Sequence, residues 1–270
     1  MKITYEKYKN FLKELLKREK KIKFFLSRVL VKTGLNYFVK INRESYQIWF
    51  SKNNIASEMF INGKSFYLQE ENFINSFLDD KSVFVDVGAN IGNLTLSASN
   101  VIKKGKIFSF EANPQTFRSL KRNIQLNKKE QITAINSAIG SKKGFLRISH
   151  LYADDCNSIQ LEGNGVEVPV QTLDHYLYNQ PNIDFLKIDI EGYELFALMG
   201  ANKTLNKTKI IYLEVWDKLT KKYQYSGIEL LTFLKNAGFQ IFLVNNKFEL
   251  TKLRNRKKFN TLEMILAVKK

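Results

Sequence analysis

Cysteine and histidine are nearly absent from this chain of 270 residues, which contains one Cys and two His. A single cysteine, Cys156, cannot form an internal disulfide bond, and one Cys with two His cannot supply the ligands of a structural zinc site. Disulfide scaffolds, dithiol redox chemistry and zinc modules are therefore excluded.

Long apolar runs are also lacking. The N-terminal region has no apolar run of about 7–15 residues as in a signal peptide, and no window approaches the roughly 20 residues that cross a bilayer. Hydrophobic residues still make up 44% of the chain, enough for a sizeable core. We expect a soluble cytoplasmic protein.

Acidic residues are outnumbered, with 26 Asp and Glu against 43 Lys and Arg, and the formal net charge is +17. Two stretches carry 12 of these 17 charges: residues 1–28 have a net charge of +7 and residues 247–258 a net charge of +5. The sequence between them is nearly balanced, so any anionic partner is expected at these two stretches.

Residues 5–31 show the apolar spacing of an amphipathic helix, or of two, with lysines on the other faces. The apolar positions are Tyr5, Tyr8, Leu12, Leu15, Ile22, Leu26 and Val29. One interpretation is a helix whose apolar stripe packs on the body of the protein. The other is peripheral attachment of residues 1–31 to an anionic membrane surface, such as the inner face of the membrane, or to an anionic substrate carrier.

The remaining pattern divides near residue 80. Residues 32–82 alternate short apolar runs with turn residues and suggest a small cap, partly helical and partly β. From residue 83 onward, apolar β runs alternate with helical stretches, which is typical of α/β proteins with a doubly wound parallel sheet. We therefore predict a basic helical segment and cap over 1–80 and one α/β domain over 81–270. The expected strands are 83–87, 106–112, 132–139, 183–190, 209–216, 239–245 and 262–269, with extra strands in "GFLRISH" and "VEVPVQTL".

Two helix starts are marked by capping residues. Asn113 followed by Pro114 gives an N-cap and a proline at the first helical position. Ser226 with Glu229 forms a capping box for a helix that ends at Gly238.

Ligands of doubly wound sheets bind at the carboxyl ends of the strands. Four of the five expected strand ends carry a carboxylate, and the first is the least expected: Asp86 stands two places before Gly88 in "VDVGANIGN". A carboxylate there would repel the pyrophosphate of a dinucleotide, and "GANIG" lacks the G-x-G-x-x-G spacing. The sulfonium and amino groups of S-adenosylmethionine would instead be attracted by Asp86. Glu111, at the end of the second strand, could accept both ribose hydroxyls of either cofactor.

Several motifs together resemble the FkbM family of S-adenosylmethionine-dependent methyltransferases: "VFVDVGANIGN", "FSFEANP", "VPVQTLDHYL", "IDFLKIDIEGYE" and "IIYLEVW". The resemblance covers about residues 83–216. It implies a Rossmann-like seven-stranded methyltransferase sheet with an antiparallel last strand, and methyl transfer to a hydroxyl of a glycan, lipid-linked sugar or natural product. It places the cofactor against Asp86, Gly88, Asn90, Gly92, Asn93, Glu111, Ala112, Asn113, Ser137, Ala138, Asn157, Ser158 and Asp189.

The candidate residues for the chemical step lie in "FLKIDIEGYE". The alternation of a strand places Lys187 and Asp189 on one face, and a buried lysine needs a carboxylate partner, so we infer that Lys187 pairs with Asp189 or Asp86. Asp189 or Glu191 is the candidate general base, or the anchor of the acceptor hydroxyl.

At the end of the next strand, Glu214 could bind acceptor hydroxyls, and Trp216 could stack on a sugar. His150 and His175 are weaker candidates for the base. A divalent metal held by Asp189 and Glu214 is conceivable, but no metal-ligand spacing indicates it.

Three other classes compete with this interpretation. The net charge suggests a nucleic-acid (RNA) methyltransferase, but "DIEGYE" stands where enzymes that grip a flipped adenine or cytosine carry (D/N)-P-P-(Y/F), so nucleic acid is disfavoured as a partner. A dinucleotide oxidoreductase is disfavoured by Asp86. A non-catalytic methyltransferase-fold scaffold that binds a membrane or partner is disfavoured by the intact cofactor motifs.

Overall fold

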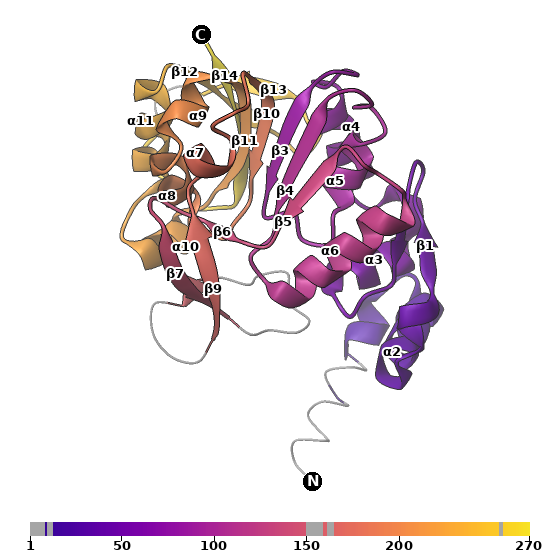
Figure 1. The fold of residues 1–270 in the computed structure, drawn as a ribbon. Coiled ribbons are helices and arrows are strands. Elements are labelled where there is room, and N and C mark those ends of the chain that lie inside the picture. Colours follow the sequence, from indigo (N-terminus) through magenta and orange to yellow (C-terminus); the bar gives the residue numbers. More distant parts are fainter. Residues whose placement is uncertain (1–8, 10–12, 150–158, 161–164, 254–255) are drawn as a thin grey trace.

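A central sheet of eight strands organises the chain in the computed structural model, which describes residues 9, 13–149, 159, 160, 165–253 and 256–270 (Figure 1). Its strands, in spatial order, are β13 (Leu250–Lys252), β12 (Phe239–Val244), β14 (Glu263–Lys269), β11 (Thr208–Val215), β10 (Ile183–Ile188), β3 (Val83–Val87), β4 (Lys106–Phe110) and β5 (Ile132–Ile135). The five strands from β11 to β5 are parallel, whereas β14 runs antiparallel to both β11 and β12. The predicted α/β sheet with an antiparallel last strand is therefore confirmed. It has eight strands instead of the expected seven, because β13 adds an edge strand that was not predicted.

Both faces of this sheet are covered by helices, because the central strands are apolar on both sides. In β10, Leu186 and Phe185 contribute to the cores on opposite faces. One face carries α7 (Leu173–Tyr176), α8 (Glu194–Met199), α9 (Asn202–Asn206) and α11 (Gly227–Asn236). The other carries α3 (Asn54–Asn62), α4 (Leu68–Asn75), α5 (Asn93–Ala98) and α6 (Pro114–Leu126). The short α10 (Asp217–Thr220) and a 3-10 turn, η3 (Lys221–Tyr223), follow β11.

The expected single strand over 132–139 is wrong. It is divided into β5 and β6 (Ala138–Ile139), which belong to different sheets. Between them, the Asn136 side chain donates hydrogen bonds to the carbonyls of Glu111 and Ala112, and this turns the chain out of the large sheet. β6 then joins β9 (Val166–Gln171), β7 (Gly144–Ile148) and β8 (Ile159–Gln160) in a small sheet, where β7 and β9 are the two extra strands expected from the sequence.

The segment before β3 packs against the large sheet. It contains α2 (Lys21–Thr33), the 3-10 turns η1 (Leu35–Phe38) and η2 (Gly63–Ser65), and a hairpin of β1 (Lys40–Asn42) and β2 (Gln47–Trp49). Its buried side chains, such as Ile48 and Met59, belong to the same hydrophobic core as Phe84 and Tyr212 of the sheet. The division of the chain at residue 80 stays a prediction.

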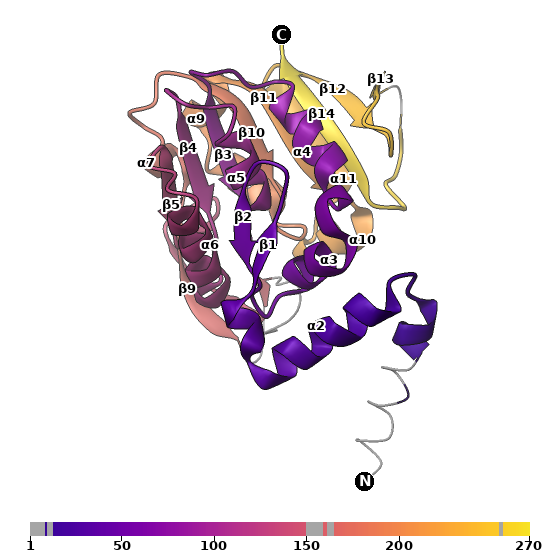
Figure 2. The ribbon, with the colours of Figure 1, turned by 90° about the vertical axis from the view of Figure 1, so that its right-hand side faces the viewer.

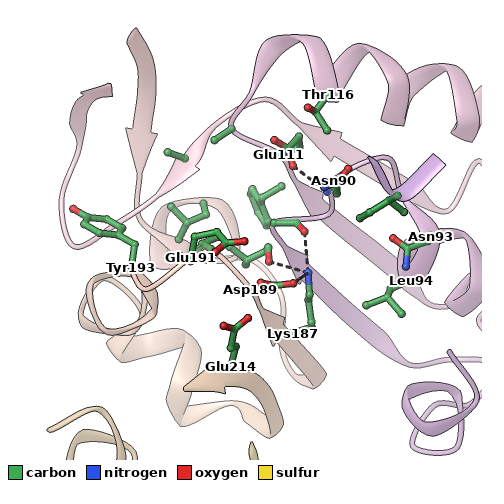
Figure 3. Close-up of a pocket in the computed structure, with 18 of the residues that line it drawn as sticks. Asn90, Asn93, Leu94, Glu111, Thr116, Lys187, Asp189, Glu191, Tyr193 and Glu214 are labelled. Carbon is green, nitrogen blue, oxygen red and sulfur yellow. Dashed lines mark hydrogen bonds and ion pairs between the residues drawn. The ribbon is translucent and has the colours of Figure 1, made fainter. Parts of the chain in front are cut away.

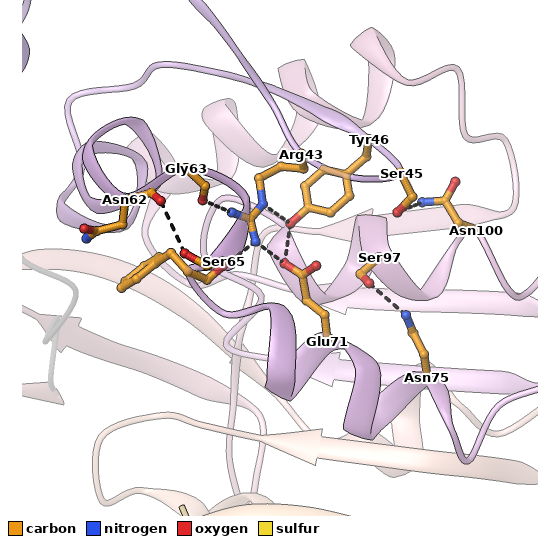
Figure 4. Close-up of polar contacts among 11 residues, drawn as sticks. Arg43, Ser45, Tyr46, Asn62, Gly63, Ser65, Glu71, Asn75, Ser97 and Asn100 are labelled. Atoms are coloured by element: carbon orange, nitrogen blue, oxygen red, sulfur yellow. Dashed lines mark hydrogen bonds and ion pairs between the residues drawn. The ribbon is translucent and has the colours of Figure 1, made fainter. Parts of the chain in front are cut away.

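A buried polar cluster fixes α4 within this segment (Figure 4). The Arg43 guanidinium donates to Glu71 Oε1 at 2.9 Å and to the Gly63 carbonyl at 2.6 Å, and the Tyr46 hydroxyl donates to Glu71 Oε1 at 2.7 Å. The Arg43 and Glu71 side chains are 1% and 4% exposed. Breaking a pair this deeply buried is costly, so α4 has one well-defined position.

Both predicted helix caps are confirmed. The Asn113 side chain accepts from the backbone N–H of Gln115 at the start of α6, with Pro114 in the first turn. Ser226 and Glu229 form the reciprocal capping box of α11. None of the helices in the described part of the chain combines the length and apolar character needed to cross a membrane.

Candidate active site

A pocket opens at the carboxyl ends of β3, β4 and β10, where the sequence predicts the ligand site (Figure 3). The loops after these strands and the small sheet form most of its wall. Ile55 of α3, Glu70 of α4 and Tyr67, directly before α4, complete it. The backbone around it is unusual: six non-glycine residues of the described chain have positive φ, and Tyr67, Asn90 and Glu191 among them line the pocket. Such conformations persist where the surroundings enforce them, commonly at functional sites.

The glycine turn after β3 is pressed against the loop after β10. Gly88 has φ of +78°, and a Cβ built on it would lie 1.9 Å from the backbone oxygen of Asp189. Only glycine permits this contact, so Gly88 holds the two loops that carry the predicted cofactor and catalytic residues.

Gly88→Ala is expected to lower the free energy of unfolding by at least about 3 kcal/mol, because backbone must move and the left-handed conformation becomes strained. Gly34→Ala is the matched control, since Gly34 has φ of +76° but a Cβ there would meet nothing within 4 Å. That control should cost only about 1 kcal/mol. Urea denaturation of both variants measures the difference, and equal losses would contradict the close packing of the two loops.

Glu111 lies at the end of β4 with its carboxylate held by backbone groups. Its oxygens accept from the N–H of Asn90 at 2.9 Å and of Asn113 at 2.8 Å. Burial raises the pKa of Glu111 to about 7, although both hydrogen bonds act in the opposite direction. The remaining lone pairs line the pocket, where a ribose could use them as the sequence suggests.

Lys187 on β10 occupies the centre of the site, between two carboxylates. Its Nζ lies 3.2 Å from Asp86 Oδ1 and 3.6 Å from Asp189 Oδ2, and it donates to the Gly88 carbonyl at 2.8 Å. Burial alone would lower the pKa of Lys187, but Asp86 and Asp189 outweigh it and raise the pKa. Lys187 therefore remains charged and fixes Asp189, whose side chain is 43% exposed at the pocket.

Asp86 does not line the pocket, which corrects the direct attraction expected between its carboxylate and a cationic ligand. Its side chain is fully buried, accepts from the Thr95 hydroxyl at 2.6 Å and pairs with Lys187. In β3 the side chains alternate, so Asp86 points to the same face as Phe84 and lies behind the pocket wall. Asp86 therefore acts on the site indirectly, by holding the ammonium group of Lys187.

Glu214, at the end of β11, is half-buried at the pocket, and its carboxyl group has unsatisfied hydrogen-bonding capacity. Its Oε1 is buried with no hydrogen-bond partner. Burial, reinforced by the nearby Asp189, Glu191 and Glu194, raises the pKa of Glu214 to about 8. At neutral pH the Glu214 carboxyl is therefore largely protonated and can donate a hydrogen bond to an acceptor oxygen.

Glu70 is a site residue that the sequence analysis missed. It lies on α4 beside the anchored Glu71, and its Oε1 accepts from the Tyr212 hydroxyl of β11 at 3.1 Å. Burial raises the pKa of Glu70 to about 7. The sequence offered only the pair "EE" in a segment whose fold could not be assigned, so no pattern connected it with strand ends more than a hundred residues away.

Glu194, the first residue of α8, has a structural role. Its side chain is 1% exposed, and Oε1 accepts from the N–H groups of Ile190 and Gly192 at 3.1 Å each. It thereby shapes the turn that presents Glu191 to the pocket.

The structure brings most of the predicted site residues together. Those lining the pocket are Gly88, Asn90, Asn93, Glu111, Ala112, Ser137, Ala138, Lys187, Asp189, Glu191 and Glu214. Asp86, Gly92, Asn113 and Trp216 do not line it. Asn157, Ser158 and His150 lie outside the described residues.

The residues that do not line the pocket have other contacts. Gly92 has φ of +94°, and a Cβ there would lie 2.6 Å from Leu120, so it allows α6 to pack closely. Trp216 donates its indole N–H to the Asn260 carbonyl at 3.2 Å and has the Lys218 ammonium over its ring. His175 is exposed on α7. Within the described ranges, no cluster of three or more His, Cys, Asp or Glu is arranged to hold a metal ion.

The strand order, the antiparallel β14 and the strand-end pocket define the class of Rossmann-like, S-adenosylmethionine-dependent methyltransferases. Residues 86–241, more than half of the chain, match the FkbM methyltransferase domain. The chain belongs to this family.

Three relatives are named as methyltransferases. The chain is 29% identical to Methyltransferase 1 of Beauveria bassiana over 166 residues, which are 50% of this chain and 67% of that protein. It is 26% identical to Methyltransferase sdnD of Sordaria araneosa over 203 residues, 61% of this chain and 76% of that protein. It is also 26% identical to the hexuronic acid methyltransferase AglP of Haloferax volcanii over 145 residues, 51% of this chain and 57% of that protein.

Among solved structures, precorrin-6y C5,15-methyltransferase from Geobacter metallireducens is similar with a TM-score of 0.46 at 16% identity, over 77% of this chain and 90% of that one. An O-methyltransferase from Thermotoga maritima gives a TM-score of 0.42 at 15% identity, over 74% of this chain and 64% of that one.

Proposed function

We propose that this methyltransferase transfers the methyl group of S-adenosylmethionine to a hydroxyl oxygen of a glycan, a lipid-linked sugar or a natural product. The observation that carries the proposal is the pocket itself. Its wall presents the carboxyl groups of Glu70, Glu111, Asp189, Glu191 and Glu214 against the single ammonium of Lys187. Burial raises the pKa of Glu70, Glu111 and Glu214 to between about 7 and about 8, so part of this group is protonated at neutral pH. The carboxyl groups still outnumber the ammonium, which suits a cationic cofactor and hydroxyl-rich acceptors and disfavours a pyrophosphate.

The pocket residues fit the cofactor in three places. The turn of Gly88 and Asn90 would face its methionine end, where the close approach of backbone leaves no room for a side chain. Glu111 would hold the ribose. Ala112, Ser137 and Ala138, which line the side next to the small sheet, would face the adenine.

When bound, the cofactor supplies an electrophilic methyl group that is already activated by the sulfonium, so alignment and proton removal are the tasks left to the chain. Lys187 holds the Asp189 carboxylate at 3.6 Å, and Asp189 accepts the proton of the acceptor hydroxyl. The partial exposure of Asp189 lets this proton pass on to solvent. Glu214, protonated at neutral pH, donates to a neighbouring acceptor oxygen, and Glu70 borders the acceptor from the α4 side.

The assignment of a glycan acceptor is supported by the relative AglP, whose name states that it methylates a hexuronic acid. A carboxylate on the acceptor would be repelled by the Asp189 carboxylate that acts as base, whereas the protonated Glu214 would donate to an acceptor oxygen. We therefore propose neutral hydroxyl-bearing acceptors for this chain.

Binding of the cofactor product gives the direct test. S-adenosylhomocysteine at about 100 times its dissociation constant should stabilise the protein by roughly 2.7 kcal/mol, which raises the melting temperature by about 5–10 °C, whereas NAD should have no effect. Transfer of a radiolabelled methyl group to neutral glycans, with uronic acids as the comparison, then tests the acceptor class. A melting shift with NAD alone would contradict the cofactor assignment, and labelling of uronic acids in preference to neutral sugars would contradict the acceptor class.

A further inference from the structure

Helix α2 has two distinct faces, and the apolar stripe predicted from the sequence lies on the face that points away from the body of the protein. Phe24 and Ser27 are fully buried and turn toward the body. Ile22, Leu26 and Val29, spaced by four and three residues, are 84%, 43% and 37% exposed. At about 100° per residue these three share one face, opposite the buried one. The interpretation that this stripe packs on the body of the protein is therefore wrong for these residues.

Further exposed apolar side chains flank α2 in the chain. Leu16 before the helix is 70% exposed, and Leu35 and Phe38 in η1 after it are 53% and 80% exposed. Figure 2 shows α2 lying across the lower end of the molecule, with η1 following it. Folded proteins seldom leave a stripe of large apolar side chains on one helix face in water unless another surface covers it.

Basic residues border this stripe on both sides. At 100° per residue, Lys21 and Lys32 fall on one flank of the stripe and Lys23 on the other, and all three side chains are exposed. An apolar face with a lysine border is the arrangement of helices that lie in the plane of an anionic lipid surface.

We propose that α2 and η1 dock on an anionic lipid surface, with Ile22, Leu26 and Val29 inserted at the boundary of headgroups and acyl chains. Lys21, Lys23 and Lys32 would contact the anionic headgroups. Charge favours this occupant over a second copy of the chain, because pairing two α2 stripes would bring their lysine borders together in a protein whose net charge is already +17.

Docking through α2 would also bring the pocket close to the lipid. Arg18 pairs with Glu58 at 2.6 Å, and Lys20 donates to the Asn62 carbonyl at 3.1 Å, so α3 is tied to the segment that leads into α2. The same α3 supplies Ile55 to the pocket wall. The antiparallel β14 ends at the C-terminus at the top of Figures 1 and 2, so α2 lies at the end where the parallel strands terminate. A lipid-linked acceptor would suit a pocket that is held close to the lipid. This step rests on the proposed function, whereas the docking of α2 on lipid does not.

Sedimentation with lipid vesicles tests the proposal on the full chain. The wild-type protein should bind vesicles of phosphatidylglycerol and phosphatidylcholine, and bind weakly to phosphatidylcholine alone. Ile22→Asp and Leu26→Asp should each weaken binding at least tenfold. Met199→Asp is the matched control, since Met199 is 46% exposed, comparable to Leu26, but lies on α8, on the other face of the sheet from α3. Changing Lys21, Lys23 or Lys32 to Gln should weaken binding about fivefold for each charge removed.

The substituted residues are exposed, so melting temperatures close to that of the wild type are expected and confirm folding. Absence of wild-type binding to anionic vesicles would overturn the proposal, and so would equal losses in Leu26→Asp and Met199→Asp. A concentration-dependent dimer in ultracentrifugation that Leu26→Asp abolishes would instead assign the stripe to a second copy of the chain. Neither vesicle binding nor its loss alters the melting shift with S-adenosylhomocysteine, so the two proposals fail independently.

Discussion

Replacing Asp189 with Asn is expected to lower kcat for methyl transfer by a factor of about 10²–10⁴, the usual contribution of a general base. Asn keeps the size of the side chain and can still accept a hydrogen bond, but it cannot take the proton of the acceptor hydroxyl. Lys187 keeps its shorter ion pair with Asp86, at 3.2 Å, so the strand end should stay in place. Binding of S-adenosylhomocysteine, measured by calorimetry, should therefore be nearly unchanged.

Asp80→Asn is a close control for this experiment. The Asp80 side chain is 41% exposed, compared with 43% for Asp189, and it also pairs with a lysine, Lys104, at 2.6 Å. It lies before β3, away from the pocket, and its substitution should leave kcat as it is. Full activity in Asp189→Asn would remove Asp189 from the chemical step. Loss of S-adenosylhomocysteine binding in the same variant would make Asp189 a cofactor ligand instead of the base.

The sequence predicts the sheet well because each central strand is a continuous apolar run, and such runs are long enough to identify one by one. The observed β3, 83–87, has the predicted bounds, and the other strands of the large sheet differ from prediction mostly at their ends. The failure at 132–139 has a local cause, since "INSA" looks like strand but contains Asn136, whose side chain binds the backbone beyond β4. A hydrogen bond to a distant backbone leaves no periodic pattern.

The site residues also divide into those that the sequence could predict and those that it could not. Residues at strand ends could be predicted, because all parallel strands finish at one edge of the sheet. Glu70 could not, because the tertiary packing of α4 places it, through the buried pair of Arg43 and Glu71. The role of Asp86 was misjudged for a related reason: sequence places it at the strand end but does not show that its side chain turns away toward Lys187.

The direction in which the apolar stripe of α2 points could not be predicted from the sequence either. Periodicity identifies an amphipathic helix but not which neighbour its apolar face meets. The structure shows that Phe24, outside the predicted stripe, is the residue that the body buries, while Ile22 remains 84% exposed.

Replacing Glu214 with Gln is expected to stabilise the protein at pH 8 by about 3 kcal/mol, and by almost nothing near pH 4. The pKa of Glu214 rises from 4.5, the ordinary value that the unfolded chain should show, to about 8 in the fold. Below pH 4.5 the Glu214 carboxyl is protonated in both the folded and the unfolded state, so its ionisation does not change the free energy of unfolding. Between pH 4.5 and 8 the unfolded state ionises while the folded state does not, so the wild type loses up to about 1.4 kcal/mol of stability for each pH unit. Partial contact of the side chain with solvent reduces the total.

Gln cannot ionise, so this loss should disappear from the variant, and urea denaturation at several pH values measures it. Glu130→Gln, on an exposed surface residue, should show the pH dependence of the wild type. Parallel curves for the wild type and Glu214→Gln would mean that Glu214 is ionised in the fold. Gln keeps a donor at this position, because its amide N–H groups can take the place of the protonated carboxyl, so the KM for the acceptor should stay close to that of the wild type. A stabilised variant with an unchanged KM is the result expected of a neutral hydrogen-bond donor at Glu214, and a large rise in KM would show that the acceptor hydroxyl donates to an ionised Glu214 instead.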